Sequence, residues 1–286
     1  MIIDCHCHLE EEMLPLDKMI ESMDKSGIHK TALITRLSPP FYVLSDPKKD
    51  KLKKLVGKIM LDYSILGRMA YKSSVKKGTF LLLGEKIKIL DTPDNDSVLQ
   101  AINKYPNRFL GWIFTNPTLQ GTEIEEVDKL QSHPNIIGVK LHPYFYNYKI
   151  ETVEKLATYC QEHNLPMLIH LSAQSNCYHY LPEKFPTLKI IYAHAGLPHW
   201  RKLWQDMYSY KNVYIDLSSV LTKEVAELAV KAMGYHKCLY GTDGPYGMSQ
   251  GGTYDYSSVV NMIEHLNLTN SQKEAVLGNT FSSLIR

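Results

Sequence analysis

The sequence lacks the features that would send the chain into or across a membrane. No window comes near the roughly 18 consecutive apolar residues that a membrane-spanning helix needs. At the N-terminus Asp4 interrupts a short apolar run, and no basic segment precedes it, so we expect no signal peptide. Cysteine is scarce as well: there are five, an odd number, without a Cys-x-x-Cys pair. Without an export signal we expect reduced thiols and a cytoplasmic protein with no membrane partner.

A strong excess of charge is also missing. The formal net charge is +2, which gives no overall attraction to nucleic acid or to anionic lipid. Hydrophobic residues make up 44% and charged residues 22% of the chain, as in an ordinary globular protein. A chain of 286 residues can bury a large core. With no linker to divide it, we predict a single domain over 1–286 that binds a small molecule and no nucleic acid.

Short apolar runs alternate with amphipathic stretches along most of the sequence. The runs are too short for typical helices and predict eight strands. These strands are expected at residues 2–7, 31–35, 109–114, 136–141, 166–170, 188–193, 212–216 and 237–241. The stretches between them predict helices, expected at residues 15–26, 122–132, 151–163, 199–209 and 222–233. Thr222 marks a helix start, and Gly27 and Gly234 mark helix ends.

The spacing of the runs predicts the fold class. From the third run onward the runs end near residues 114, 141, 170, 193, 216 and 241. A spacing of roughly 22 to 29 residues suits one strand, one helix and two loops, and such repeats form parallel sheets. Eight runs favour a closed α/β structure, the (β/α)8 TIM barrel, which takes about 250 residues. An open doubly wound sheet would use the same local pattern.

Residues 36–108 are too long for one crossover and predict a helical insertion after the second strand. The insertion is basic. Its cationic residues include Lys48, Lys49, Lys51, Lys53, Lys54, Lys58, Arg68, Lys72, Lys76, Lys77, Lys86 and Lys88. One interpretation is a solvated excursion, because charge runs usually face water. The other is a lid that attracts an anionic substrate, with Tyr63, Leu66, Met69 and Tyr71 as apolar surface for docking.

The first strand ends in Asp4-Cys5-His6-Cys7-His8. Because side chains alternate along a strand, Asp4, His6 and His8 are predicted to share one face and the two cysteines the other. Two imidazoles on one face can converge on one metal ion, and zinc accepts neutral imidazole nitrogen readily. Asp4 could orient an imidazole from behind. The thiols could serve as ligands instead if this segment were not a strand.

Three further histidines directly follow apolar runs: His142, His170 and His194. Barrel active sites are built at the C-terminal ends of strands, so we expect these side chains near the first pair. A lone histidine there is more often a hydrogen-bonded core residue, but three at corresponding positions favour a functional site.

Asp243 follows the last predicted strand, directly before Gly244 and Pro245. A turn residue is the simpler interpretation. However, the first and last strands of a closed barrel are neighbours, which predicts that Asp243 lies beside His6 and His8. A carboxylate there could take a proton from a metal-activated water.

As an ordered set, these motifs resemble the amidohydrolase superfamily, and within it the amidohydrolase-2 branch of metal-dependent hydrolases and decarboxylases. The segments that carry the resemblance are Asp4-x-His6-x-His8, Gly138-Val139-Lys140-Leu141-His142-Pro143, His170, His194-Ala195-Gly196, Gly241-Thr242-Asp243 and Val276-Leu277-Gly278-Asn279-Thr280.

The resemblance implies one divalent metal ion held by His6, His8, His170 and Asp243, with His194 as acid/base. Zinc is the expected ion and manganese the alternative. Family members with two ions use a carboxylated lysine or a glutamate on the fourth strand. Lys140 has the inward parity for that role, but its sequence context favours one ion.

We therefore expect a metal-dependent hydrolase in which an activated water attacks the carbonyl of an amide, lactone or ester of a small, anionic molecule. Asp243 would shuttle the proton. His194, Lys140 or His142 would stabilise the oxyanion, and Arg36 would pair with a substrate carboxylate. The alternatives are non-oxidative decarboxylation of an aromatic or unsaturated acid and a barrel that has lost its chemistry. A homodimer could form through exposed aromatics among the nineteen tyrosines.

Overall fold

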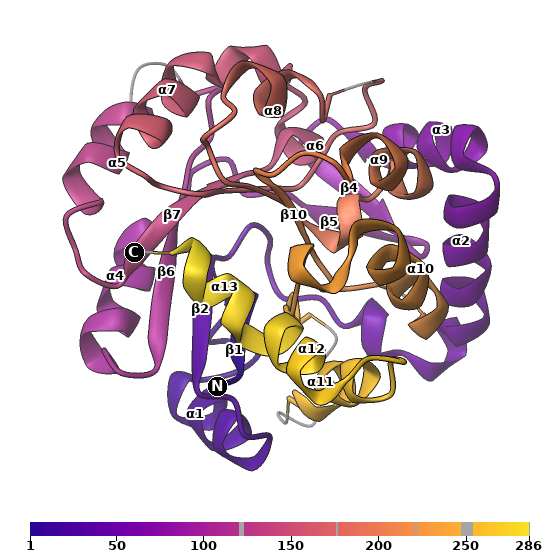
Figure 1. Cartoon of the computed structure of the whole chain (residues 1–286), viewed down its shortest axis with the longest axis horizontal. Coiled ribbons are helices and arrows are strands. Elements are labelled where there is room, and N and C mark those ends of the chain that lie inside the picture. The colour runs from indigo at the N-terminus through magenta and orange to yellow at the C-terminus, as the bar shows by residue number, and fades with distance from the viewer. Residues whose placement is uncertain (120–122, 176, 221, 247–253, 286) are drawn as a thin grey trace.

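The computed structural model describes residues 1–119, 123–175, 177–220, 222–246 and 254–285. Its main element is a sheet of eight parallel strands in the order β1-β2-β6-β7-β8-β9-β10-β11 (Figure 1). The strands are β1 (Ile3–Leu9), β2 (Lys30–Thr35), β6 (Phe109–Phe114), β7 (Ile136–Leu141), β8 (Met167–Ile169), β9 (Ile190–Tyr192), β10 (Val213–Asp216) and β11 (Cys238–Leu239). All eight lie where the apolar runs predicted them.

The sheet closes on itself between its first and last strands. The Cys5 amide donates to the carbonyl oxygen of Tyr240 at 3.0 Å, and the Asp243 amide donates to that of His6 at 2.7 Å. A parallel bridge joins Cys7 to Gly244. The predicted (β/α)8 barrel is thereby confirmed, and the open sheet is excluded.

Helices surround the barrel: most cover the outer faces of its strands, and the C-terminal one lies across one end (Figure 1). They are α1 (Leu16–Lys25), α4 (Asn95–Lys104), α5 (Glu123–Leu130), α6 (Pro143–Tyr146), α7 (Glu154–Glu162), α8 (Tyr180–Lys184), α9 (Trp200–Met207), α10 (Lys223–Met233), α11 (Ser257–Glu264), α12 (Asn270–Glu274) and α13 (Thr280–Leu284). As predicted, Thr222 caps α10, accepting from the Val225 amide, and the helix ends at Gly234 with φ of 86°. No helix in the described part of the chain has the length and apolarity to cross a membrane.

Two apolar layers hold the barrel together. Inside it, residues such as Ile34, Trp112 and Ile191 form one cluster, which Phe281 of α13 joins from the bottom. Outside it, strand residues such as Leu33, Ile113 and Val139 pack against the helices. Because both faces are buried, the strands read as continuous apolar runs rather than as alternating ones.

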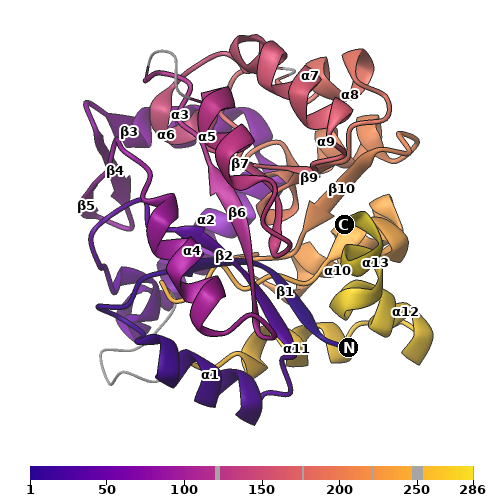
Figure 2. The same cartoon turned by 90° about the vertical axis from the view of Figure 1, so that its left-hand side faces the viewer.

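The insertion after β2 differs from its prediction in two ways. It contains two helices, α2 (Asp50–Asp62) and α3 (Ser64–Ser74), but also a three-stranded antiparallel sheet. The strands of this sheet are β3 (Val75–Lys76), β4 (Thr79–Leu82) and β5 (Glu85–Lys88), visible at one side of the molecule in Figure 2. The turns between them use Gly78 and Gly84 at φ of 70° and 92°, which only glycine adopts without strain.

The C-terminal boundary of the insertion also moves. Residues 95–104 form α4, which packs on β2 and β6 and is the crossover helix between them. The insertion therefore covers residues 36–94 rather than 36–108, and it is mixed rather than purely helical.

Candidate metal centre and active site

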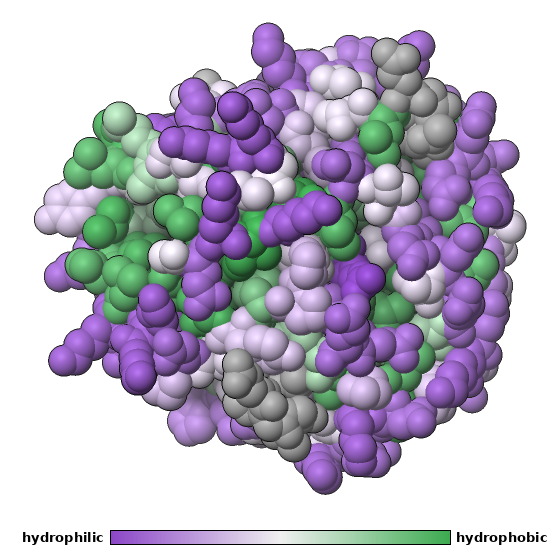
Figure 3. All heavy atoms as spheres, turned by 180° about the vertical axis from the view of Figure 1, so that it is seen from behind, coloured by the Kyte–Doolittle hydropathy of each residue, from purple (hydrophilic) through white to green (hydrophobic). Residues whose placement is uncertain are grey.

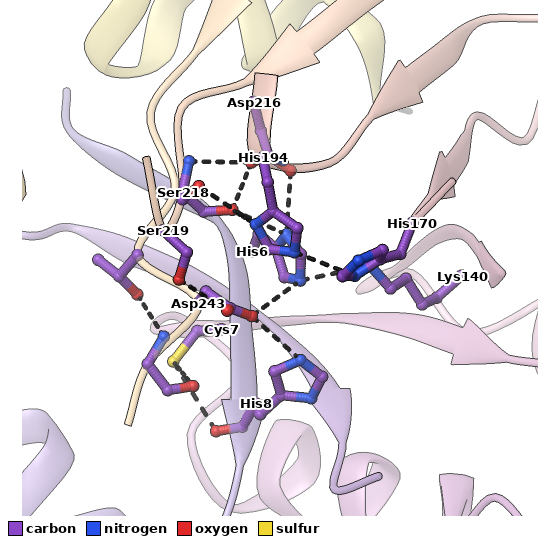
Figure 4. Close-up of polar contacts among 12 residues, drawn as sticks. His6, Cys7, His8, Lys140, His170, His194, Asp216, Ser218, Ser219 and Asp243 are labelled. Atoms are coloured by element: carbon purple, nitrogen blue, oxygen red, sulfur yellow. Dashed lines mark hydrogen bonds and ion pairs between the residues drawn. The ribbon is translucent and has the colours of Figure 1, made fainter. Parts of the chain in front are cut away.

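The structure brings the side chains expected at strand ends together at one end of the barrel (Figure 4). His6 and His8 belong to β1, while His170 and His194 follow β8 and β9. Asp243 follows β11 and lies between the two β1 histidines. Its Oδ1 is 3.4 Å from Nε2 of His6 and 3.3 Å from Nε2 of His8. These three groups could share a metal ion.

Hydrogen bonds fix which nitrogen of each imidazole carries the proton. Nδ1 of His6 lies 2.9 Å from Oδ2 of Asp216, and Nδ1 of His8 lies 3.1 Å from the carbonyl oxygen of Thr35. Both partners can only accept, so in a neutral ring Nδ1 holds the proton and Nε2 holds a lone pair. Two lone pairs then face the oxygen of Asp243. Such an arrangement is repulsive unless a cation offsets it; the Lys140 ammonium, 3.3 Å from Nε2 of His6, does so in part, and a metal ion between the groups would do so fully.

The protonation states suit metal binding. Burial, together with the Lys140 ammonium, lowers the pKa of His6 to about 4 and keeps the ring neutral. Burial alone would raise the pKa of Asp243, but the nearby imidazoles, chiefly that of His194, lower it well below its usual range. Neutral imidazoles and an ionised carboxylate are the forms that bind metals.

The predicted alternation along β1 is only half correct. His6 and His8 do converge, but Cys5 lies in the inner apolar cluster and Cys7 in the outer one, so the two cysteines do not share a face. The pairing of β1 with β2 shifts register between Asp4 and Cys7. This irregularity occurs where β1 must bond to β2 on one side and to the segment 240–244 on the other.

Asp4 does not orient an imidazole, contrary to its predicted role. Its carboxylate accepts from the amides of His6 and Thr242 at 3.1 Å each and from the Thr242 hydroxyl at 2.6 Å. Burial raises its pKa to about 7. Asp4 therefore ties β1 to the loop that presents Asp243.

The carboxylate that does orient an imidazole is Asp216, at the end of β10, which the sequence analysis missed. Its Oδ1 accepts from the amides of His194 and Ser218 at 3.0 and 2.9 Å, while Oδ2 faces His6. Burial would raise its pKa, but its close interaction with His6 lowers it to about 2. A signal was present in the sequence, because Asp216 directly follows an apolar run as His170 and His194 do.

His170 does not join the group formed by His6, His8 and Asp243. Its Nδ1 lies 3.1 Å from Nε2 of His194, and its Nε2 lies 2.5 Å from the hydroxyl of Tyr71. Tyr71 comes from α3 of the insertion and stacks on Tyr144 with ring centroids 3.9 Å apart. The insertion thus reaches the catalytic end of the barrel through a buried tyrosine.

Left-handed backbone conformations occur at two of the site residues. His194 and Asp243 have φ of 55° and 57°. For residues other than glycine such conformations cost about 1–3 kcal/mol each and cluster at functional sites. At His194 the turn directs Nδ1 to the hydroxyl of Ser218 at 2.9 Å. At Asp243 it directs Oδ2 to the hydroxyl of Ser219 at 2.8 Å.

Lys140 and His142, the expected oxyanion-stabilising pair, occupy different positions. Nζ of Lys140 is fully buried 3.3 Å from Nε2 of His6, beneath the cavity rather than in its wall. Burial lowers its pKa to about 8. His142 does line the cavity, and its Nδ1 accepts from the Phe145 amide at 3.2 Å. Lys140 is therefore placed to act on the metal centre, and His142 on a bound molecule.

Arg36 points away from the site. Its guanidinium lies 2.6 Å from the carboxylate of Glu12 and 3.5 Å from that of Glu10, and its side chain is not part of the cavity wall. The expected pairing with a substrate carboxylate is not supported. The interpretation of Arg36 as a solvated loop arginine fits the structure better.

The imidazoles open into a cavity of about 1030 Å³. His8, His142, His170, His194 and Asp243 form its floor. Much of its wall comes from the insertion, between Leu37 and Leu83. Hydrophobic side chains gather on the side of the molecule where α2 and α3 lie, with hydrophilic ones beside them (Figure 3).

The insertion lines the cavity, but the charge expected of a lid that attracts anions is not found there. Of the twelve lysine and arginine residues named for it above, only Lys53 lines the cavity. Of the four residues expected to dock, Tyr71 is buried at the floor, whereas Tyr63, Leu66 and Met69 are exposed. The insertion covers the site with apolar side chains and turns its lysines toward water.

Comparison with known proteins agrees with this geometry. A family model described as Amidohydrolase, of the amidohydrolase-2 type, matches residues 86–280. Among proteins with curated descriptions, none matches the sequence.

Solved structures with the same fold include three enzymes of different chemistry. A 5-carboxyvanillate decarboxylase from Novosphingobium aromaticivorans, complexed with manganese, has a TM-score of 0.59 and 16% identity over 93% of this chain and 79% of that one. A 4-oxalomesaconate hydratase from Rhodopseudomonas palustris has a TM-score of 0.62 and 14% identity over 99% of this chain and 95% of that one. A probable 2-pyrone-4,6-dicarboxylic acid hydrolase from Acinetobacter baumannii, with citric acid bound, has a TM-score of 0.64 and 15% identity over 99% of this chain and 98% of that one. At these identities the likeness concerns the fold.

Proposed function

The chain belongs to the amidohydrolase-2 family of enzymes, and on this premise we propose that it is a metal-dependent hydrolase acting on the carbonyl of an ester, lactone or amide. The observation that carries the proposal is the convergence of Nε2 of His6 and of His8 on Oδ1 of Asp243. With both Nδ1 protons engaged elsewhere, this geometry calls for a cation.

Two imidazoles and a carboxylate suit zinc or manganese. We propose one ion of zinc per chain, with manganese as the alternative, as in the decarboxylase of similar fold. His170 is the proposed fourth ligand, although its present contacts with His194 and Tyr71 give it a weaker claim than the other three. When bound, such an ion lowers the pKa of a coordinated water toward neutrality and polarises a substrate oxygen.

The remaining steps fall to the side chains on the cavity floor. Asp243, ionised and held by Ser219, accepts the proton of the attacking water at Oδ1. His142 keeps Nδ1 as an acceptor for the Phe145 amide, so a neutral ring carries its proton on Nε2 and donates to the developing oxyanion. His194, with Nδ1 held by Ser218, is the proposed acid toward the leaving group.

Elemental analysis of the purified protein tests the metal centre. We expect about one zinc or manganese ion per chain and its loss in His8→Ala, because one of the two converging Nε2 atoms is removed. His265→Ala, which removes an exposed imidazole from the end of α11, should retain the ion. An unchanged metal content in His8→Ala would contradict the assignment.

One observation favours decarboxylation of an aromatic acid as the second candidate. Flat rings flank the floor: Tyr71 stacks on Tyr144, and His142 stacks on Phe145, in both cases with centroids 3.9 Å apart. Such surfaces suit a planar acid. Carbon dioxide release from a panel of carboxylated aromatics, with no hydrolysis of esters or amides, would select this function. Metal-dependent turnover of any substrate would exclude a barrel without chemistry.

Two further expectations stay predictions. We propose a cytoplasmic location, and sedimentation of the purified chain tests for a homodimer.

A further inference from the structure

The cavity is much larger than the chemistry at its floor requires. Ligand sites usually measure about 300–1,000 Å³, and an engineered cavity of about 150 Å³ holds benzene. The cavity here measures about 1030 Å³. A single aromatic acid at the floor would leave most of it unfilled.

The part of the cavity away from the floor is apolar. Its wall includes Leu44, Val56 and Met60 from the insertion, and Val259 and Met262 from α11. Apart from Asp243, only Lys53 and Asp255 contribute a charged side chain among the described residues of the wall. This region therefore favours hydrocarbon over charged groups.

Those two charged groups are already occupied within the protein. Nζ of Lys53 donates to the carbonyl oxygen of Leu44 at 2.8 Å and pairs with Asp50 at 2.5 Å. The Asp255 carboxylate accepts from the amide of Ser257 at 2.8 Å and from its hydroxyl. Both groups thus already have partners within the protein, and Lys53 has its charge balanced by Asp50. The notion of a basic lid that attracts an anion therefore does not fit this wall.

We propose that the substrate is an amphiphile, an ester or amide whose carbonyl lies on the floor and whose long apolar acyl chain fills the space beneath the insertion. The proposal rests on the hydrolase function above. One water is consumed: its oxygen forms a bond to the acyl carbon while the bond from that carbon to the ester oxygen or amide nitrogen breaks. The products are a carboxylic acid with the apolar chain and an alcohol or amine, which receives the proton.

The apolar wall also provides the entrance. Leu52 of α2 and Leu81 of β4 line the cavity and are at the same time 39% and 54% exposed to solvent. Because the lining continues to the surface at these two residues, an acyl chain can enter without crossing a ring of charges. Leu55, one turn after Leu52, is 54% exposed but does not line the cavity.

A series of p-nitrophenyl esters from acetate to octanoate tests the substrate class with the metal-loaded enzyme. Burial of each added methylene should raise kcat/KM by up to about fourfold. The free alkanoates should inhibit with the same dependence on chain length. A kcat/KM that is flat or falls with chain length would overturn the proposal.

Charged variants at the entrance provide the matched test. Leu52→Lys and Leu81→Lys place an ammonium in the apolar wall at exposed positions that tolerate it in folding. Each should reduce the ratio of octanoate to butyrate turnover by about tenfold or more, because an acyl chain cannot pack against a hydrated charge. Leu55→Lys should leave that ratio unchanged. Equal ratios in all three variants would contradict the assigned path.

The outcomes separate this inference from the proposed function. Hydrolysis without preference for chain length would support the proposed hydrolase function and contradict the proposed acyl-chain site. Alkanoates could instead bind more tightly with increasing chain length while no ester or amide is turned over. That result would support the apolar site and contradict the hydrolase function.

Discussion

The floor and the wall of the cavity are built by opposite means. The floor collects side chains from five strand ends far apart in the sequence, and its polar groups are held by specific partners, as Asp243 is by Ser219. The wall comes largely from one continuous segment, 37–83, and offers apolar side chains that are partly exposed. The difference teaches that reaction type and substrate choice are specified separately here. In the proposed enzyme the barrel would fix the first and the insertion the second, and the two meet where Tyr71 contacts His170.

The largest effect is expected from replacing the proposed proton acceptor of the floor. Asp243→Asn should lower kcat by about 10³-fold, since general base catalysis contributes about 10²–10⁴-fold, while zinc content is retained. The matched control is Asp255→Asn, which alters a carboxylate of the wall that accepts from Ser257. Steady-state kinetics on the best ester measure both. Full activity in Asp243→Asn would remove the proton-shuttle role.

The next effect concerns the residue behind the floor. Asp216→Ala should weaken zinc affinity about 10- to 100-fold, the usual cost of removing a group that orients a ligand. Asp216→Asn should restore part of it, because an amide oxygen still accepts from Nδ1 of His6. Competition with a chromogenic chelator measures the affinity. As control, Glu10→Gln alters a buried carboxylate that faces Arg36 rather than an imidazole; equal losses in both positions would indicate general destabilisation.

A smaller effect tests the one place where wall and floor meet. Tyr71→Phe removes the hydroxyl that contacts Nε2 of His170 and keeps the stacked ring. The loss of one such hydrogen bond predicts a change of about 3- to 10-fold in kcat/KM. Tyr144→Phe removes instead a hydroxyl that bonds to Ser74, and should change kcat/KM less. A larger change in kcat/KM for Tyr144→Phe than for Tyr71→Phe would show that the insertion does not act through His170.

The smallest effect concerns the charge of the insertion. Lys51 and Lys58 are exposed on α2 and do not line the cavity. Reversing both to glutamate should change kcat/KM for an anionic ester by less than about twofold, since exposed charges at a distance are screened at physiological salt. A tenfold drop in kcat/KM that disappears at high salt would instead show that the charge of the insertion attracts an anionic substrate.

Much of the floor could be predicted because barrel geometry makes it a local property of each strand. His8, His194 and Asp243 were found from their place after an apolar run. Asp216 obeyed the same rule and was overlooked because a carboxylate at a strand end resembles a loop residue. Arg36 followed a strand as well, yet its partners Glu10 and Glu12 come from another loop that no local pattern reveals.

The sequence by itself determined the eight strands, the barrel and the family, because apolar periodicity and residue order survive without knowledge of contacts. Only the tertiary structure decided which nitrogen of each histidine is free, where Lys140 and His170 point, and that the insertion presents leucines rather than lysines to the cavity. The physical reason is that these depend on distances between segments remote in the chain. A periodic pattern defines a face, whereas a hydrogen bond or a cavity wall requires its partner.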